Sequence, residues 1–298
     1  GDRSQIDYVS DALMEDINED YDSAPAGLVG VGELLFPLVY KKLGAVLVAI
    51  IKRFVSKRHH DFVPTLFEEL TKVFVLQKFS ALLWKQMKDN AAEAYTNNPA
   101  GAGGEESEPH GGTYLIEQLK AYLLAHPGTE VSLVGHSAGS ILHCHLLDWF
   151  VRNGVPVQTC SFLAPAVRTD QFRRAVEAAA HVLGAFHLHA MPDRDERDDR
   201  CGQLPGTGGP VYGKSLLYLV AYSFETDTPA RLLGLARHVE ADHRGLAGDV
   251  DPEVRAWLRV RGQCHWHRPR LERPDATLHG SFDDDPATIA ALIERVRG

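Results

Sequence analysis

The stretch that decides the fold is residues 131–139, which read VSLVGHSAG. A short apolar run leads into the pattern G-x-S-x-G around Ser137, and an apolar helix pattern follows it. In a nucleophile elbow the serine sits in a strained turn that exposes its hydroxyl, and Gly135 and Gly139 suit such a turn because a Cβ there would collide with the neighbouring strand or helix. The pentapeptide alone arises by chance in about one chain of this length in ten. The strand and helix around it therefore carry the prediction that Ser137 is a nucleophile.

Helix and strand patterns alternate through residues 113–298 on either side of this turn. Such alternation predicts an α/β fold, with a mostly parallel sheet and helices on both of its faces. Strands are expected at residues 131–134, 157–163 and 185–191, with further extended segments at 254–260 and 263–267. Helices are expected at residues 113–125, 138–152, 169–182, 212–224 and 285–297.

The predicted general base is His279, because a serine hydroxyl needs a base to accept its proton. His279 follows the last extended segment, and the acidic run at 283–285 supplies capping oxygens for the final helix. His265 and His267 compete for the role, but both are expected on a strand. His136 is not expected to be the base, because adjacent side chains at such a turn point in different directions.

The acid that orients this base is expected in residues 192–199, PDRDERDD, directly after the strand at 185–191. In open α/β sheets the carboxyl ends of the strands form the rim that carries the site. Asp193 comes first after the strand and fits best. Asp195 and Asp198 remain open as alternative acids.

These motifs resemble those of the α/β-hydrolase superfamily, and particularly its esterase- and lipase-like members with a GHSAG elbow. The resemblance covers residues 113–298 and rests on the elbow at 135–139, the acid loop and the element at His279. It implies a serine hydrolase that forms an acyl-enzyme on Ser137, which water then hydrolyses. It also implies that the backbone N–H of Ala138 contributes to an oxyanion hole.

Residues 1–112 depart from that family, because they read as a mainly helical region with few strand patterns. Helices are expected at 33–41, 43–56 and within 61–95, and a loop at 97–112. Within the strongly apolar segment at residues 28–55, the longest run without a charged residue is 43–51, with nine residues, whereas a membrane span needs about twenty. These helices are interpreted as a cap or packing layer. A membrane-surface contact through residues 28–58, which end in a basic cluster, is the alternative.

The composition and motifs of the chain limit the classes of partner, compartment and cofactor that are expected. The net charge of −9 disfavours nucleic acid, and four scattered cysteines suit a reducing compartment, so a cytoplasmic protein is expected. No cofactor motif is present. A metal site is not expected either, because Cys264, His265 and His267 lack a fourth ligand at a recognisable spacing.

Two functions follow from this reading. The first is hydrolysis of carboxylic esters, lipid or small, by a Ser137–Asp193–His279 triad. The second is a catalytically weak or inactive hydrolase-like domain that serves binding or assembly. The strand at 131–134 is expected at the sheet edge, because no strand is read before it. A missing N-terminal segment, a partner chain or a misread strand within residues 28–80 would then cover that edge.

Overall fold

A computed structural model describes residues 76–96, 109–203, 210–227, 229–240, 249–271 and 277–297. The predictions for residues 1–75, including the membrane-surface contact, lie outside this part, as does most of the loop at 97–112. The chain divides into two compact units, Gly1–Ala81 and Leu82–Gly298. Of the first unit, only the start of helix α4 is described.

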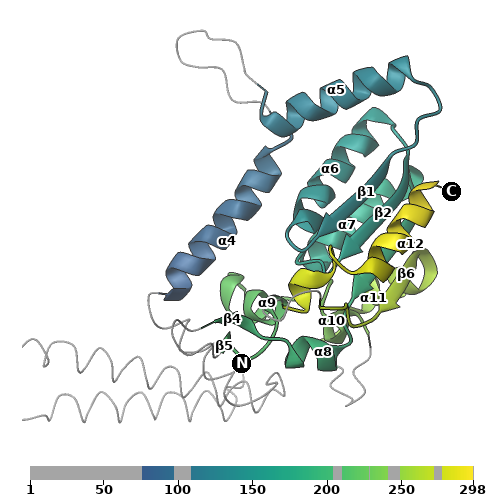
Figure 1. Ribbon diagram of the computed structural model, residues 1–298. Helices are drawn as coiled ribbons and strands as arrows, with labels where there is room; N and C mark the ends of the chain where they lie inside the picture. Colours follow the sequence, from purple (N-terminus) through teal and green to yellow (C-terminus); the bar gives the residue numbers. More distant parts are fainter. Residues whose placement is uncertain are drawn as a thin grey trace, which may run out of the picture. The chain divides into compact units, whose positions relative to one another are not determined.

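A four-stranded, all-parallel sheet forms the centre of the second unit (Figure 1). Its order is β1-β2-β3-β6, with adjacent strands in parallel register. The predicted α/β arrangement with a parallel sheet is therefore confirmed. The strand bounds are β1 Ser132–His136, β2 Val157–Leu163, β3 Leu183–Ala190 and β6 Gly262–Trp266.

One face of the sheet packs against an aromatic and aliphatic layer. Helices α6 (Gly139–Asn153), α7 (Thr169–Ala178) and α11 (Pro252–Arg261) contact one another or the strands there. Phe162 and Phe186 of the sheet meet Phe172 of α7, and Trp257 of α11 completes the cluster. Successive strands joined by helices on one face are what right-handed crossovers produce.

Helix α11 corrects the prediction of an extended segment at residues 254–260. Asp251 caps the helix by accepting the backbone N–H groups of Glu253 and Val254, and Pro252 opens its first turn. Val254 and Leu258, four residues apart, are the buried residues of its inner face. The helix start signal Asp-Pro thus outweighs the alternation of apolar and charged residues.

The opposite face of the sheet packs against α12 (Pro286–Arg297), drawn in yellow in Figure 1. Arg295 donates to His189 Nε2 of β3 at 2.8 Å and to His265 Nε2 of β6 at 3.1 Å. Asp285 caps the helix by accepting from the backbone N–H and the hydroxyl of Thr288. Helices therefore cover both faces, and the acidic run caps α12 as predicted.

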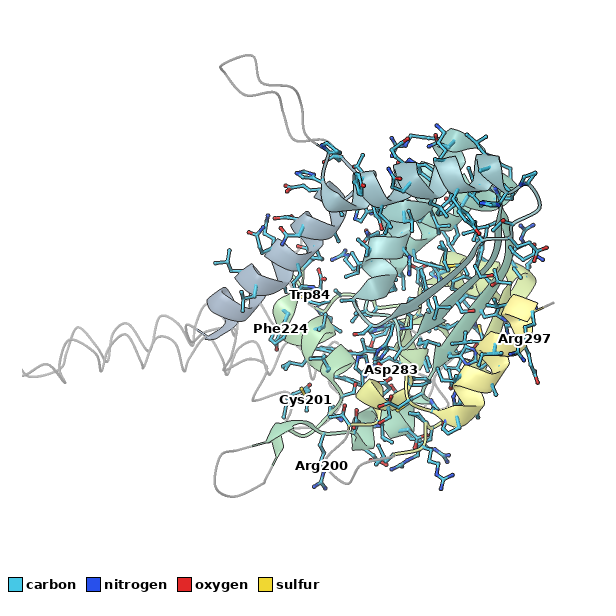
Figure 2. All side chains as sticks on the ribbon, turned by 45° about the horizontal axis from the view of Figure 1, so that its top comes forward. Trp84, Arg200, Cys201, Phe224, Asp283 and Arg297 are labelled. Carbon is cyan, nitrogen blue, oxygen red and sulfur yellow. The ribbon has the colours of Figure 1, made fainter. Side chains whose placement is uncertain are left out.

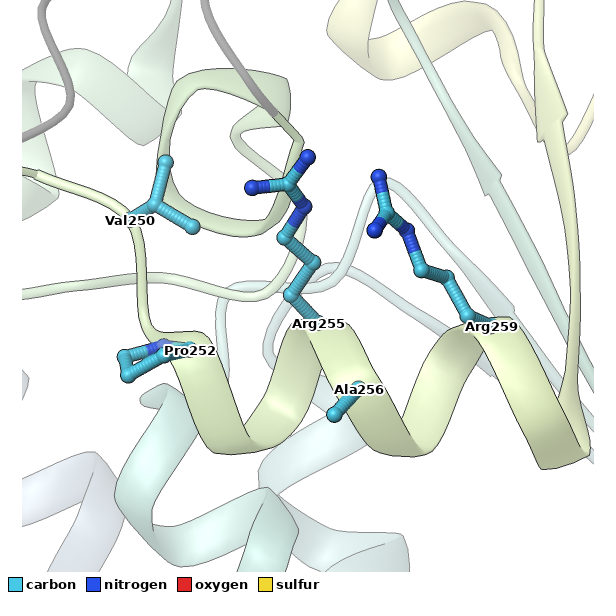
Figure 3. Close-up of a pocket in the computed structure, with 5 residues that line it drawn as sticks. All are labelled: Val250, Pro252, Arg255, Ala256 and Arg259. Atoms are coloured by element: carbon cyan, nitrogen blue, oxygen red, sulfur yellow. The ribbon is translucent and has the colours of Figure 1, made fainter.

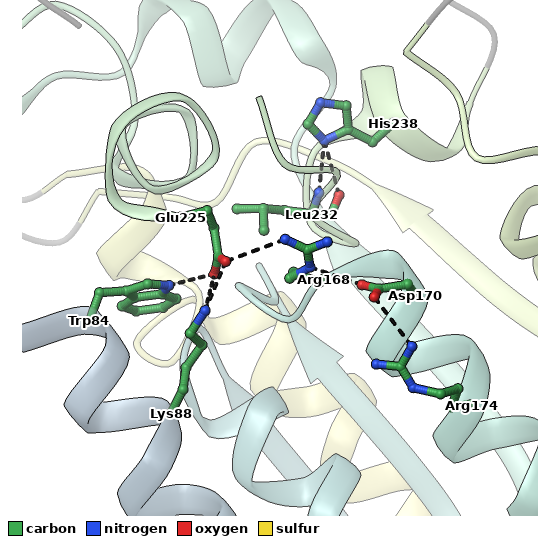
Figure 4. Close-up of polar contacts among 8 residues, drawn as sticks. All are labelled: Trp84, Lys88, Arg168, Asp170, Arg174, Glu225, Leu232 and His238. Carbon is green, nitrogen blue, oxygen red and sulfur yellow. Dashed lines mark hydrogen bonds and ion pairs between the residues drawn. The ribbon is translucent and has the colours of Figure 1, made fainter. Parts of the chain in front are cut away.

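Helices α4 (Leu76–Glu93) and α5 (Gly111–Ala125) precede the sheet. Within the second unit, Trp84 Nε1 donates to Glu225 at 2.6 Å, and Lys88 Nζ lies 2.8 Å from the same carboxylate (Figure 4). Arg168, which precedes α7, lies 3.5 Å from it. The buried charge of Glu225 thus joins residues 82–93 of α4 to the core.

The segments between β3 and α11 are short, and they replace the single helix predicted at 212–224. Residue Tyr212 ends β5, Ser215 caps α9, and a π-helical turn, η2, continues from it. The remaining bounds are η1 Ala179–His181, α8 Asp193–Asp198, β4 Cys201–Gln203, β5 Pro210–Tyr212, α9 Leu216–Leu219, η2 Val220–Phe224, α10 Ala236–Val239 and η3 His279–Ser281.

No helix in the described part of the chain combines the length and the apolar character needed to cross a bilayer.

Candidate active site

Ser137 occupies a sharp turn between β1 and α6. Its φ is +51°, a region that residues other than glycine rarely enter. Neighbouring backbone holds the turn: Ser137 N donates to Leu163 O at 2.9 Å, and Ser137 O accepts from Ala166 N at 3.0 Å. The hydroxyl of Ser140 also donates to Ser137 O, at 2.6 Å. The strained strand-to-helix turn predicted from the sequence is present.

The two glycines of the motif have different roles. A Cβ added to Gly135 would lie 2.5 Å from His143 Cδ2 and 3.2 Å from the backbone of Gly139, so this position needs glycine. A Cβ added to Gly139 would meet nothing within 4 Å. The expected collision at Gly139 is therefore wrong, because the start of α6 leaves open space there.

The predicted pairing of Ser137 with His279 is present in the structure. His279 Nε2 lies 2.9 Å from Ser137 Oγ. His279 is 4% exposed, and burial, with a smaller contribution from the charge of His136, lowers its pKa to about 3. The imidazole is therefore neutral at pH 7 and can accept the serine proton. The competitors lie elsewhere, with His265 on β6 and His267 bonded to Thr288.

The structure does not bring the predicted acid, Asp193, to the base. Asp193 Oδ1 accepts from Tyr218 Oη at 2.6 Å, and Tyr218 Oη accepts from Arg237 at 3.3 Å. Nδ1 of His279 is buried and has no hydrogen-bond partner within the described residues. The engagement of Asp193 with Tyr218 is the physical reason for this departure.

The two alternative acids are not brought to His279 either. Asp195 is buried, with Arg194 and Arg268 as its nearest cations, at 3.7 Å and 3.6 Å. Asp198 is exposed at the end of α8. Neither carboxylate forms a hydrogen bond with the imidazole, whose Nδ1 has no partner in the part of the chain that the structure describes.

Asp199 is the carboxylate that contacts the base, and sequence reasoning missed it. Its two oxygens accept the backbone N–H groups of Leu278 at 2.9 Å and of His279 at 3.0 Å. The prediction favoured the carboxylate nearest the end of β3. Helix α8 instead takes up the first residues of the acidic run, so that the residue after the helix reaches the His279 segment. The sequence signal that could have predicted this is the run DRDERD at residues 193–198, which forms α8 and leaves Asp199 directly after the helix.

Ala138 stands at the N-cap of α6, directly after the nucleophile. The first N–H groups of a helix have no acceptor within the helix, and the helix dipole makes this end positive. The backbone there is suited to an oxyanion, as the resemblance implies for Ala138.

Within the described residues β1 pairs with β2 alone and is an edge strand, and Val134 at its centre is 43% exposed.

A separate pocket of about 350 Å³ lies along α11 (Figure 3). It belongs to neither the Ser137 turn nor the His279 segment. The residues that line the pocket are Val250, Pro252, Arg255, Ala256 and Arg259.

In the described ranges, no group of three His, Cys, Asp or Glu side chains is arranged to hold a metal ion.

Comparison with protein-family models, with curated proteins and with solved structures finds no match for this chain. The geometry around Ser137 and His279 is therefore the basis for assigning a function.

Proposed function

We propose that this chain is a serine hydrolase that acts on carboxylic esters, lipid or small, with the architecture of the α/β-hydrolase superfamily. The observation that carries the proposal is the 2.9 Å contact between Ser137 Oγ and His279 Nε2, beside a turn with φ +51° at Ser137. The order of elements agrees with it: the serine follows β1, an acidic run follows β3, and the histidine follows β6. Hydrolases of this kind carry Ser, Asp and His in that chain order.

The proposed reaction begins when His279 Nε2 takes the proton of Ser137 and Oγ attacks the ester carbonyl carbon. The carbonyl oxygen becomes an oxyanion near the N–H of Ala138. Collapse of this intermediate breaks the bond to the alcohol, which leaves with the proton from His279. Water then attacks the acyl group on Ser137, with His279 again as base, and releases the carboxylic acid.

In this proposal Asp199 replaces Asp193 as the acidic residue that supports the base. Its contact is with the main chain of His279, so it fixes the position of the ring and contributes negative charge beside the imidazolium that forms. For Ser137 to donate to Nε2, the neutral ring must carry its own proton on Nδ1, which has no acceptor among the described residues. An unpaired buried donor costs about 1–3 kcal/mol.

The lack of an acceptor for Nδ1 of His279 among the described residues also supports the second candidate function, a binding or assembly domain. Among the described residues no carboxylate reaches Nδ1, so the imidazolium would be poorly stabilised. In the same part of the chain β1 has no strand on its outer side, where a neighbouring strand would bring a second oxyanion donor. A catalytically weak domain used for binding or assembly is therefore the alternative to an efficient esterase.

A fluorophosphonate probe separates the two functions, since it reacts only with an activated serine. We expect the wild-type protein to label, Ser137→Ala to lose labelling, and Ser132→Ala, on the same strand outside the turn, to label like wild type. The same three proteins are assayed with p-nitrophenyl esters of increasing acyl length. Labelling that persists in Ser137→Ala overturns the assignment, and a wild-type protein that neither labels nor hydrolyses esters supports the binding module.

A further inference from the structure

His136, the last residue of β1, contacts the segment that carries the base. Its Nε2 lies 3.0 Å from the backbone oxygen of His279. Because a carbonyl oxygen only accepts hydrogen bonds, Nε2 must carry the proton and donate. Its other ring nitrogen, Nδ1, lies 3.7 Å from Asp283 Oδ2. Asp283, labelled in Figure 2, follows η3 on the same segment, so one ring contacts that segment at two points.

We propose that His136 is a positioning residue, which holds the main chain of His279 at the distance from Ser137 that proton transfer requires. The catalytic part of this inference rests on the proposed function. His136 precedes the nucleophile directly, so the base is tied to the same strand end that presents the serine.

The need for such a contact follows from how His279 is held. Its N–H is bound by Asp199 and its C=O by His136, on opposite sides of the same residue. Nδ1 of the ring has no hydrogen-bond partner among the described residues. A carboxylate at Nδ1 would ordinarily orient the imidazole. Here hydrogen bonds to the main chain take over that task.

Charge on His136 has a second effect on the base. The two rings lie 5.4 Å apart between centroids. Burial is the larger cause of the lowered pKa of His279, and the charge of His136 is the second cause. The other charged groups that face this pair are Asp199, at the His279 backbone, and Asp283, at His136. Removal of the His136 charge should raise the pKa of His279.

Two substitutions separate the hydrogen bond from the charge. His136→Leu removes both, and we expect kcat to fall about 10- to 100-fold with KM changed less than about threefold, since small misplacements of catalytic groups cost rates of that order. His136→Gln keeps an N–H donor without a charge, so it should recover most of that loss. The acid limb of its pH–rate profile should move to higher pH than in wild type.

The control is His181→Leu, an exposed histidine in η1, which should leave rate and pH profile unchanged. Thermal unfolding of each variant tests folding, and His136→Gln supplies the result if His136→Leu does not fold. Equal rates and profiles for wild type and both His136 variants overturn the inference.

A readout without catalysis keeps this test apart from the proposed function. The pKa of His279 is followed by NMR titration of histidine-labelled protein, with the signal assigned by His279→Asn. We expect a higher pKa in both His136 variants than in wild type, and an unchanged pKa overturns the electrostatic effect. If wild type does not label with fluorophosphonate, the proposed function fails while the titration still reports on His136.

Discussion

At the scale of single residues, the backbone of Ser137 carries strain that its hydrogen bonds sustain. A φ of +51° at a residue with a Cβ costs about 1–2 kcal/mol. Hydrogen bonds from Ala166 and Ser140 to Ser137 O, and from Ser137 N to Leu163 O, hold the turn in place. Because this strain affects the free energy of unfolding, it can be tested by a stability measurement that does not depend on catalysis.

Ser137→Gly is predicted to be about 1 kcal/mol more stable than Ser137→Ala, because glycine adopts positive φ without a penalty. Both variants lack the hydroxyl, so the comparison isolates the backbone. Urea unfolding of the two proteins gives the difference. At an unstrained site the alanine variant would be the more stable one, and that order would show that the turn is relaxed.

Asp199→Asn is predicted to reduce turnover by at least about tenfold, and more than Asp193→Asn does. An asparagine amide presents an N–H₂ group where Asp199 now accepts the N–H of Leu278 or His279, so one buried donor loses its acceptor. The matched control is the exposed Asp198→Asn, which should behave like wild type. Rates of ester hydrolysis and of fluorophosphonate labelling provide the measurement. A larger loss in Asp193→Asn would return the role to the first residue of the run.

At the scale of elements, the interface between α12 and the sheet requires neutral histidines. Arg295 has only donors, so His189 and His265 must offer unprotonated nitrogens to it. Burial first, then the charges of Arg295 and neighbouring histidines, lower the pKa of His187 to about 4 and of His189 to about 3. In the unfolded chain a histidine has a pKa of about 6.5.

The free energy of unfolding is therefore predicted to fall as the pH drops from about 6.5 toward 4, because the unfolded state then binds more protons than the folded state. Arg295→Met should weaken this dependence, since it removes a cation that opposes protonation of the histidines. Urea unfolding between pH 7.5 and 4.5 measures both slopes. Arg297→Met, an exposed arginine on the same helix, is the control and should keep the wild-type slope. Equal slopes for wild type and Arg295→Met would contradict the role of this cluster.

Elements with a strong local signal were predictable from the sequence. β2 has the predicted bounds, β1 and β3 differ at their ends, and the Ser137–His279 pair follows from a motif and from chain order. The acid was not predictable in the same way, because its place depends on how α8 turns the chain. α11 was missed because alternation of apolar and charged residues was given more weight than the Asp251–Pro252 start.

At the scale of the whole second unit, Glu225 links segments far apart in the sequence. It accepts from Trp84 and Lys88 of α4, and it also faces Arg168 beside α7 (Figure 4). Hydrogen bonds to a buried charged group contribute about 1.5–3 kcal/mol each. We therefore expect this carboxylate to contribute to holding residues 82–93 on the core.

Glu225→Ala is predicted to lower the free energy of unfolding by at least about 2 kcal/mol, because it leaves Lys88 and the Trp84 N–H without their acceptor, while Arg168 keeps its contact with Asp170. Trp84→Phe, which loses a single donor, should cost less. Limited proteolysis should show earlier cleavage within residues 82–93 of Glu225→Ala. Lys85→Ala is the control, because its exposed partner Asp89 lies on the same helix. Unchanged stability in Glu225→Ala would mean that α4 is held by other contacts.

The order β1-β2-β3-β6 also has a consequence for how the site is assembled during folding. β1, β2 and β3 are neighbours both in the chain and in the sheet, whereas Ser137 and His279 are 142 positions apart. Closing a longer loop costs more entropy, and contacts between distant positions form slowly. We therefore expect the segment from β1 to β3 to form first, with its serine present but without a base. Reactivity of Ser137 would then appear only when the C-terminal part of the chain docks, so that fluorophosphonate labelling during refolding follows the last step rather than formation of the sheet.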